Sequence, residues 1–114
     1  MIELSKSNRR IAREIIEKGL QIEYAKGLQD VEKILQKKDI KGQTPQENYH
    51  ELLRNVINFD KQIARRYDGM KGSNYLIIIA CQLMDGYISE TDIEPLAEEV
   101  KLWIHQFINF RKQD

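Results

Sequence analysis

Residues 11–35 read IAREIIEKGLQIEYAKGLQDVEKIL, and this stretch decides the fold. Its apolar side chains recur at steps of three and four, which is the spacing that brings them to one side of an α-helix. Charged side chains fill many of the positions between them. The pattern therefore predicts one long amphipathic helix over about residues 7–38. Gly19 and Gly27 are unfavourable inside a helix, and we interpret them as places where a neighbouring helix comes close.

A second helix follows after a short linker. Residues 44–47 read TPQE, which is a capping box with proline in the first helical turn. This helix is therefore predicted over about residues 45–68, and Gly69 suits its left-handed end.

Two shorter helices complete the chain. Residues 74–86 are mostly apolar and predict a short buried third helix. The segment 75–80 also fits a buried strand, but no other segment alternates with a period of two, so a strand would have no partner. The last helix is predicted over about residues 92–112, where Pro95 fits only in the first turn.

These elements lead to one predicted fold. The chain has 114 residues, of which 41% are apolar, and this suits one globular domain. The linkers near residues 39–44, 69–73 and 86–91 are short enough to favour antiparallel neighbours. We predict an all-α, four-helix, mainly antiparallel up-and-down bundle with a short buried third helix, which forms a single helical domain over residues 1–114.

The sequence shows no constellation of catalytic or metal-binding residues. It has no Gly-x-Ser-x-Gly turn, no glycine-rich phosphate loop after a strand, and only two histidines. Glu47 and His50 have the Glu-x-x-His spacing of di-iron bundles, but the second copy that such a site needs is missing. We therefore expect a protein that is not an enzyme and that has no cofactor and no metal.

Residues 85–92, DGYISETD, resemble the second half of a calcium-binding EF-hand loop. The positions that begin such a loop carry no oxygen ligands in this chain, so calcium binding is not expected. We interpret the segment as a corner between helices, in which Gly86 is left-handed and Ser89 or Asp92 caps the next helix.

The compartment is predicted from the apolar runs and from the cysteine count. The first residues lack the apolar run and cleavage site of a secretory signal, and the longest apolar run, residues 75–81, is far shorter than the ~20 residues that cross a bilayer. Cys81 is the one cysteine, and we expect it to be a small buried side chain in a reducing compartment. We predict a cytoplasmic protein with no membrane partner.

Self-association is the function class that the long helix favours. Its apolar stripe would extend about 45 Å, while the third helix would be only about 20 Å long and could not cover it. Exposed apolar surface of that size usually marks an interface, and two-fold homodimers are the commonest closed assembly. We predict protein–protein interaction, as a homodimer or with another helical protein. The predicted self-association stripe consists of Ile11, Ile15, Leu20, Tyr24, Leu28, Val31 and Leu35.

Nucleic-acid binding is the alternative function. Basic side chains cluster in residues 6–13 and 61–66. The side chains that would contact phosphates are Arg9, Arg10, Arg13, Arg65 and Arg66. The whole chain is neutral, with 18 basic and 18 acidic side chains, whereas a nucleic-acid module normally carries an excess of positive charge. The sequence therefore favours protein–protein interaction.

Overall fold

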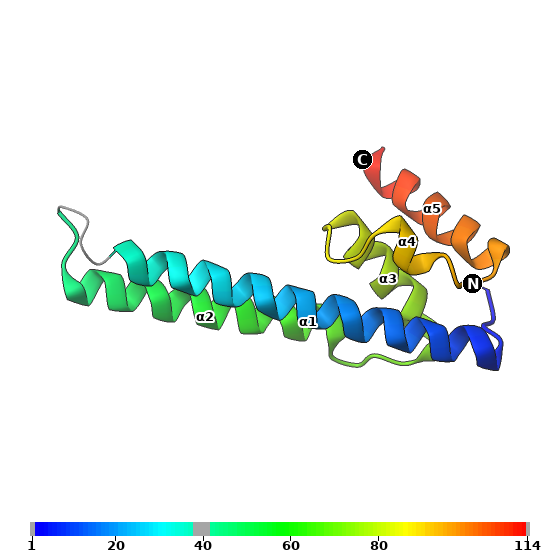
Figure 1. The fold of residues 1–114 in the computed structure, drawn as a ribbon, viewed down its shortest axis with the longest axis horizontal. Helices are drawn as coiled ribbons and strands as arrows, with labels where there is room; N and C mark the ends of the chain where they lie inside the picture. The colour runs from blue at the N-terminus through cyan, green and yellow to red at the C-terminus, as the bar shows by residue number, and fades with distance from the viewer. Residues whose placement is uncertain (1, 38–41, 114) are drawn as a thin grey trace. The chain divides into compact units, whose positions relative to one another are not determined.

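The computed structural model of the chain describes residues 2–37 and 42–113. Within these ranges every regular element is a helix, so the all-α prediction is confirmed. Of the described helices, none combines the length and the apolar character needed to cross a bilayer. The elements are α1 (Lys6–Gln36), α2 (Pro45–Tyr67), a short 3-10 turn (Gly72–Asn74), α3 (Tyr75–Met84), α4 (Glu90–Ile93) and α5 (Glu98–Lys112) (Figure 1).

Tertiary contacts divide the chain into two compact units. Unit 1 combines Met1–Ile22 with Gly69–Asp114, and unit 2 is Glu23–Asp68. α1 contributes to both units, because its 31 residues span about 46 Å, whereas α2 has 23 residues and α3 only 10. The sequence predicted a single domain, and the contacts group the chain into two units that each include part of α1.

The core of unit 1 forms where α3 packs against α5. Leu76 and Ile79 of α3 are almost completely buried, and so are Val100 and Ile104 of α5. The prediction of a short buried third helix is confirmed, and the strand alternative for residues 75–80 is wrong.

Gln82 extends this core from α3 to α1. Its side chain is completely buried, and its Nε2 donates a hydrogen bond to the backbone oxygen of Ile16 at 3.0 Å. Gly19 makes room for it, because a Cβ atom at this position would lie 2.6 Å from Cδ of Gln82. The interpretation of Gly19 as a place of close approach is confirmed. Cys81, which was expected to be buried, is half-buried.

The helix predicted over residues 92–112 is in fact two helices, α4 and α5. α4 begins at Glu90, because Asp92 accepts hydrogen bonds from the backbone N–H and the hydroxyl of Ser89, at 2.8 and 3.1 Å. This early start places Pro95 beyond the first turn, where its ring and its missing N–H prevent the helix from continuing. The chain therefore turns after α4, and α5 begins as a new helix.

The other predicted helix ends are confirmed. The hydroxyl oxygen of Thr44 accepts a hydrogen bond from the backbone N–H of Glu47 at 3.1 Å and begins α2. Gly69 and Gly86 have φ angles of 75° and 80°, which is the left-handed region that glycine adopts at little cost. These turns end α2 and α3 where the sequence indicates.

Asp92 also connects α4 to α1 within unit 1. Its Oδ1 lies 2.5 Å from Nζ of Lys18. The hydrogen bond from Lys18 is the main cause that holds the pKa of Asp92 below its usual 3.8, and the N–H of Ser89 lowers it further. The ionised carboxylate therefore stabilises both the start of α4 and the contact between α4 and α1.

Replacement of Ile79 by alanine should lower the free energy of unfolding by about 2–4 kcal/mol, because it leaves a cavity in the α3–α5 core. Leu102→Ala is the control, since Leu102 is 58% exposed on α5, and it should change stability by less than about 0.5 kcal/mol. Reversible urea unfolding measures both. Equal losses in the two variants would contradict this description of the core.

Asp92→Asn should reduce stability at neutral pH but make little difference in strong acid. Because the pKa of Asp92 is lowered in the folded state, its contribution is present above its usual value of 3.8 and is lost as the pH falls below it. Urea unfolding of both proteins at pH 6 and near pH 2.5 measures the difference. Asp60→Asn, the same substitution at an exposed position of α2, is the control and should change stability little. A constant deficit for Asp92→Asn at both pH values would contradict the assignment.

Candidate interaction surface

Unit 2 is a helical hairpin in which the second part of α1 runs antiparallel to α2. Lys37 Nζ lies 3.0 Å from Glu51 Oε1 near one end, and Glu23 binds Tyr67 at the other. The helices meet along a seam whose positions follow steps of three and four. The seam positions are 23, 27, 30 and 34 on α1 and 48, 52, 55 and 59 on α2.

The seam buries few large apolar side chains completely, since Leu52 and Phe59 are only half-buried. Among the described residues of unit 2 only Glu23, Gly27, Ile34 and Asn48 are buried, and Ile34 is the one large apolar side chain among them. Gly27 admits the ring of Phe59, because a Cβ atom there would lie 2.7 Å from Cε2 of that ring. The close approach predicted at Gly27 is confirmed. The two helices are held together at this level by the fit of a ring against a glycine more than by the burial of large apolar side chains.

A buried carboxylate lies at one end of the seam. Glu23 has no exposed surface, and its Oε1 accepts a hydrogen bond from the hydroxyl of Tyr67 at 2.7 Å. Nε of Arg66 lies 3.2 Å from the same oxygen, and the Arg66 side chain is almost buried. An ionised group in this position must be paired, because an unpaired buried charge is very costly. These two residues of α2 therefore hold the α1 carboxylate and set the alignment of the two helices.

A second row of side chains follows one residue after the seam positions, and most of it is apolar and exposed. Two positions differ: Val31 is half-buried, and the residue after Phe59 is the charged Asp60. On α1 it contains Tyr24, Leu28, Val31 and Leu35, and on α2 it contains Tyr49, Leu53 and Val56, with Ile57 beside it. Leu28 is 71% exposed and Tyr49 is 62% exposed.

The two exposed rows lie on the same side of the hairpin. A groove of about 160 Å³ lies between them and is lined by Leu28 and Val31 of α1 and by Val56 and Phe59 of α2. Tyr24 meets Phe59 edge to face, with ring centroids 5.4 Å apart, at one end of this groove. We call the seven exposed side chains around the groove the apolar face; they are Tyr24, Leu28, Leu35, Tyr49, Leu53, Val56 and Ile57.

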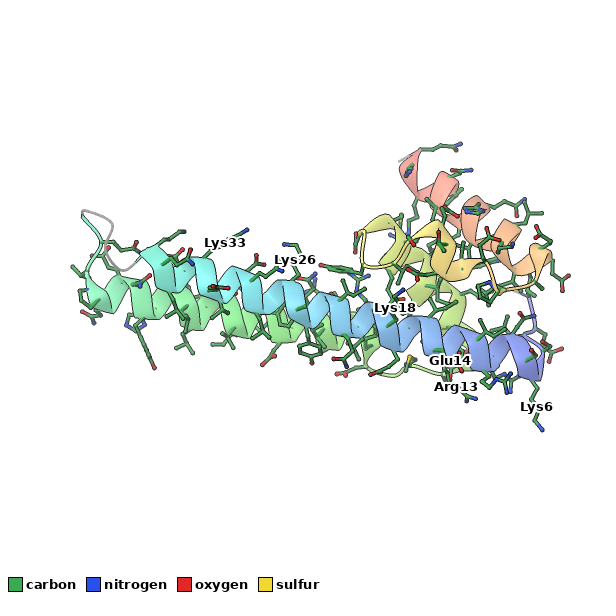
Figure 2. The ribbon with its side chains drawn as sticks, in the orientation of Figure 1. Lys6, Arg13, Glu14, Lys18, Lys26 and Lys33 are labelled. Carbon is green, nitrogen blue, oxygen red and sulfur yellow. The ribbon has the colours of Figure 1, made fainter. Side chains whose placement is uncertain are left out.

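The other side of the hairpin is polar. Lys26 follows Tyr24 by two residues, and Lys33 follows Val31 by two, which is a rotation of about 200° around the helix. Figure 2 shows both lysines projecting into solvent from α1. The contrast between the two sides makes the apolar face a distinct surface.

A shallow polar cavity of about 330 Å³ lies along the start of α2. Within it Glu51 accepts hydrogen bonds from Lys37 at 3.0 Å and from Gln43 at 2.8 Å, and these bonds lower its pKa. His50 and Glu47, the candidate metal pair, also line this cavity. In residues 2–37 and 42–113, no three acidic, histidine or cysteine side chains come together as a metal site would require.

No protein-family model, no curated protein sequence and no solved structure matches this chain.

The predicted self-association stripe is divided between the two units. Ile15 is buried in unit 1, where Ile11 and Leu20 are half-buried. The part that stays exposed lies in unit 2, and it consists of Tyr24, Leu28 and Leu35, with Val31 half-buried. The matching row on α2 was not predicted from the sequence.

The basic residues proposed for nucleic-acid contact are placed differently. Arg9, Arg10 and Arg13 are exposed on α1 in unit 1. In unit 2 Arg65 is exposed, but the guanidinium of Arg66 is held against Glu23 inside the hairpin. Arg66 therefore serves the fold, and four of the five arginines remain accessible.

Tyr67→Phe should lower the free energy of unfolding by about 1–3 kcal/mol, because it removes a hydroxyl that donates to a buried carboxylate. Tyr49→Phe removes the same atom from an exposed ring and should change stability by less than about 0.5 kcal/mol. Thermal and urea unfolding of the two variants provide the comparison. A Tyr67→Phe protein as stable as Tyr49→Phe would show that Glu23 does not depend on this bond.

Proposed function

We propose that this chain acts by protein–protein association through the apolar face of the α1–α2 hairpin, and that it catalyses no reaction. The observation that supports the proposal is the pair of exposed apolar rows on one side of unit 2. Single exposed apolar side chains are normal on any protein, but a contiguous patch of several hundred Å² usually marks an interface.

The size of the apolar face supports the same proposal. At typical side-chain areas its exposed fractions amount to roughly 600 Å², which approaches the ~800 Å² that each partner contributes to a stable interface. Covering this area would also supply unit 2 with the apolar burial that its own seam lacks.

Nucleic-acid binding remains the second candidate, and the exposed Arg9, Arg10 and Arg13 are the observation that favours it. The balanced net charge and the engagement of Arg66 with Glu23 weigh against it. If these arginines did contact phosphates, binding would fall steeply with salt, whereas apolar association would not.

A photo-crosslinking amino acid at position 28 should trap a protein on the apolar face when the full-length chain is irradiated in its source cell. Leu28 is a suitable site, because its side chain is already largely exposed. The control places the same amino acid at position 33, since Lys33 lies on the opposite side of α1. We expect discrete protein adducts from position 28 and few from position 33. Equal yields from the two positions, or none from position 28 in a folded protein, would overturn the proposal.

A further inference from the structure

We propose that unit 1 contains a binding site for a phosphate group, formed by the segment before α1, the first turns of α1 and the turn before α3. The ligand class is a molecule that carries a doubly charged phosphate, such as a phosphomonoester or a pyrophosphate. The site goes beyond the association proposed for the hairpin and is independent of it, because it uses no residue of the apolar face.

The site is an open cavity of about 410 Å³ within unit 1. It is lined by Ile2, Glu3, Leu4, Arg9, Gly72 and Ser73. Both of its walls are held in place. On one side Leu4 is buried, and on the other the backbone N–H of Lys71 donates a hydrogen bond to Oδ1 of Asn74 at 2.9 Å, directly before the buried Tyr75. The volume lies in the range of small-molecule sites.

Arg9 provides most of the donor groups in this cavity. Its Nη2 donates a hydrogen bond to the backbone oxygen of Leu4 at 3.4 Å, and its Nε lies 3.7 Å from the place that a Cβ atom on Gly72 would occupy. The side chain therefore lies between the two walls. It makes no ion pair within residues 2–37 and 42–113, and its planar guanidinium can bind two oxygens of a phosphate at once. The hydroxyl of Ser73 adds a donor from the turn before α3.

Four further basic side chains accompany Arg9. Three are exposed at steps of three and four on the first turns of α1, and the fourth is exposed in the turn before α3. We call the five side chains the basic patch; they are Lys6, Arg9, Arg10, Arg13 and Lys71. Figure 2 shows Lys6 and Arg13 projecting from the same side of α1. In the part of the chain that the structure describes, none of the five pairs with an acidic side chain.

The basic patch is unfavourable unless an anion compensates it. Like charges at steps of three and four on a helix repel each other, and cations at the start of a helix oppose its dipole. The first turn of α1 contains no acidic side chain that would offset these effects. Glu3 lines the cavity and Glu14 follows Arg13, so the five basic side chains keep a net charge of +3 beside these two acids. A bound dianion would remove most of this repulsion.

The concentration of the charge favours one phosphate group over a long polyanion. The distance along α1 from Lys6 to Arg13 is only about 10 Å, and the chain as a whole is neutral. A nucleic-acid module normally carries an excess of positive charge. A phosphomonoester instead concentrates a charge of about −1.5 to −2 on one centre at neutral pH, which is more than a carboxylate carries. The basic patch therefore matches a phosphomonoester better than a nucleic acid or an acidic peptide.

Isothermal titration calorimetry of the full-length chain with inorganic pyrophosphate tests the proposal. We expect saturable binding to one site per chain, with a dissociation constant below about 1 mM. Arg9→Gln should weaken binding about tenfold or more, because it removes a charged donor from the cavity. Ser73→Ala should weaken it about threefold. Arg65→Gln removes the same charge as Arg9→Gln from an exposed position of α2, and this control should change the affinity by less than about twofold. Circular dichroism confirms that each variant is helical.

Vesicles distinguish the two sources of such a phosphate. Phosphatidylcholine vesicles that contain a phosphorylated inositol lipid carry the group as a lipid headgroup. Binding to these vesicles that pyrophosphate displaces would identify a lipid ligand, and binding of pyrophosphate without binding to the vesicles would identify a soluble one. Both results support the site.

Three results would overturn the proposal. The first is an absence of pyrophosphate binding up to about 10 mM. The second is an equal loss of affinity in Arg9→Gln and Arg65→Gln, which would remove the site from the cavity. The third is a single-stranded oligonucleotide without terminal phosphates that binds more tightly than pyrophosphate, which would make the basic patch a nucleic-acid surface. Crosslinking from position 28 does not depend on any of them, so this site and the proposed function fail separately.

Discussion

The rest of the structure depends on how the apolar side chains of α1 are covered along its 31 residues. Each must be removed from water by a neighbouring element or remain on the surface. In unit 1, Ala12, Ile15 and Ile16 of α1 are buried in a core to which several elements contribute. In unit 2, α2 is the one helix beside it, and two paired helices cover about one stripe of each other. The second stripe of each helix therefore stays exposed.

The interactions in the hairpin seam favour alignment over stability. Glu23 is buried against Arg66 and Tyr67, and Gly27 receives the ring of Phe59. Buried ionic contacts contribute little net free energy, because desolvation offsets the attraction, but they disfavour any shift of one helix along the other. The large apolar side chains that could have stabilised this seam lie one residue further on, where they are available to another molecule.

The sequence predicted well those features that depend on neighbours in the chain. Thr44, Gly69 and Gly86 identified helix ends correctly, because capping and left-handed turns act within a few residues. The last helix was wrongly predicted as one piece. The hydrogen bonds from Ser89 to Asp92 start α4 at Glu90, two residues earlier than predicted. Pro95 then falls beyond the first turn and ends the helix instead of fitting into it. Half of the apolar face was expected from residues 24–35. The half on α2 was not predicted, because the sequence does not show which side of α2 faces α1.

The sequence by itself determined that the chain is helical and where most helices begin and end, since periodicity, proline and glycine act locally. Only the tertiary structure decided which of two adjacent rows on α1 and α2 became the seam. Hydrophobicity alone would have selected the row of Leu28 and Leu35. The row of Glu23, Gly27 and Ile34 forms the seam instead. Phe59 fits against Gly27, and Arg66 and Tyr67 pair with the carboxylate of Glu23. These partners lie more than thirty residues away in the chain, so local sequence patterns do not reveal them.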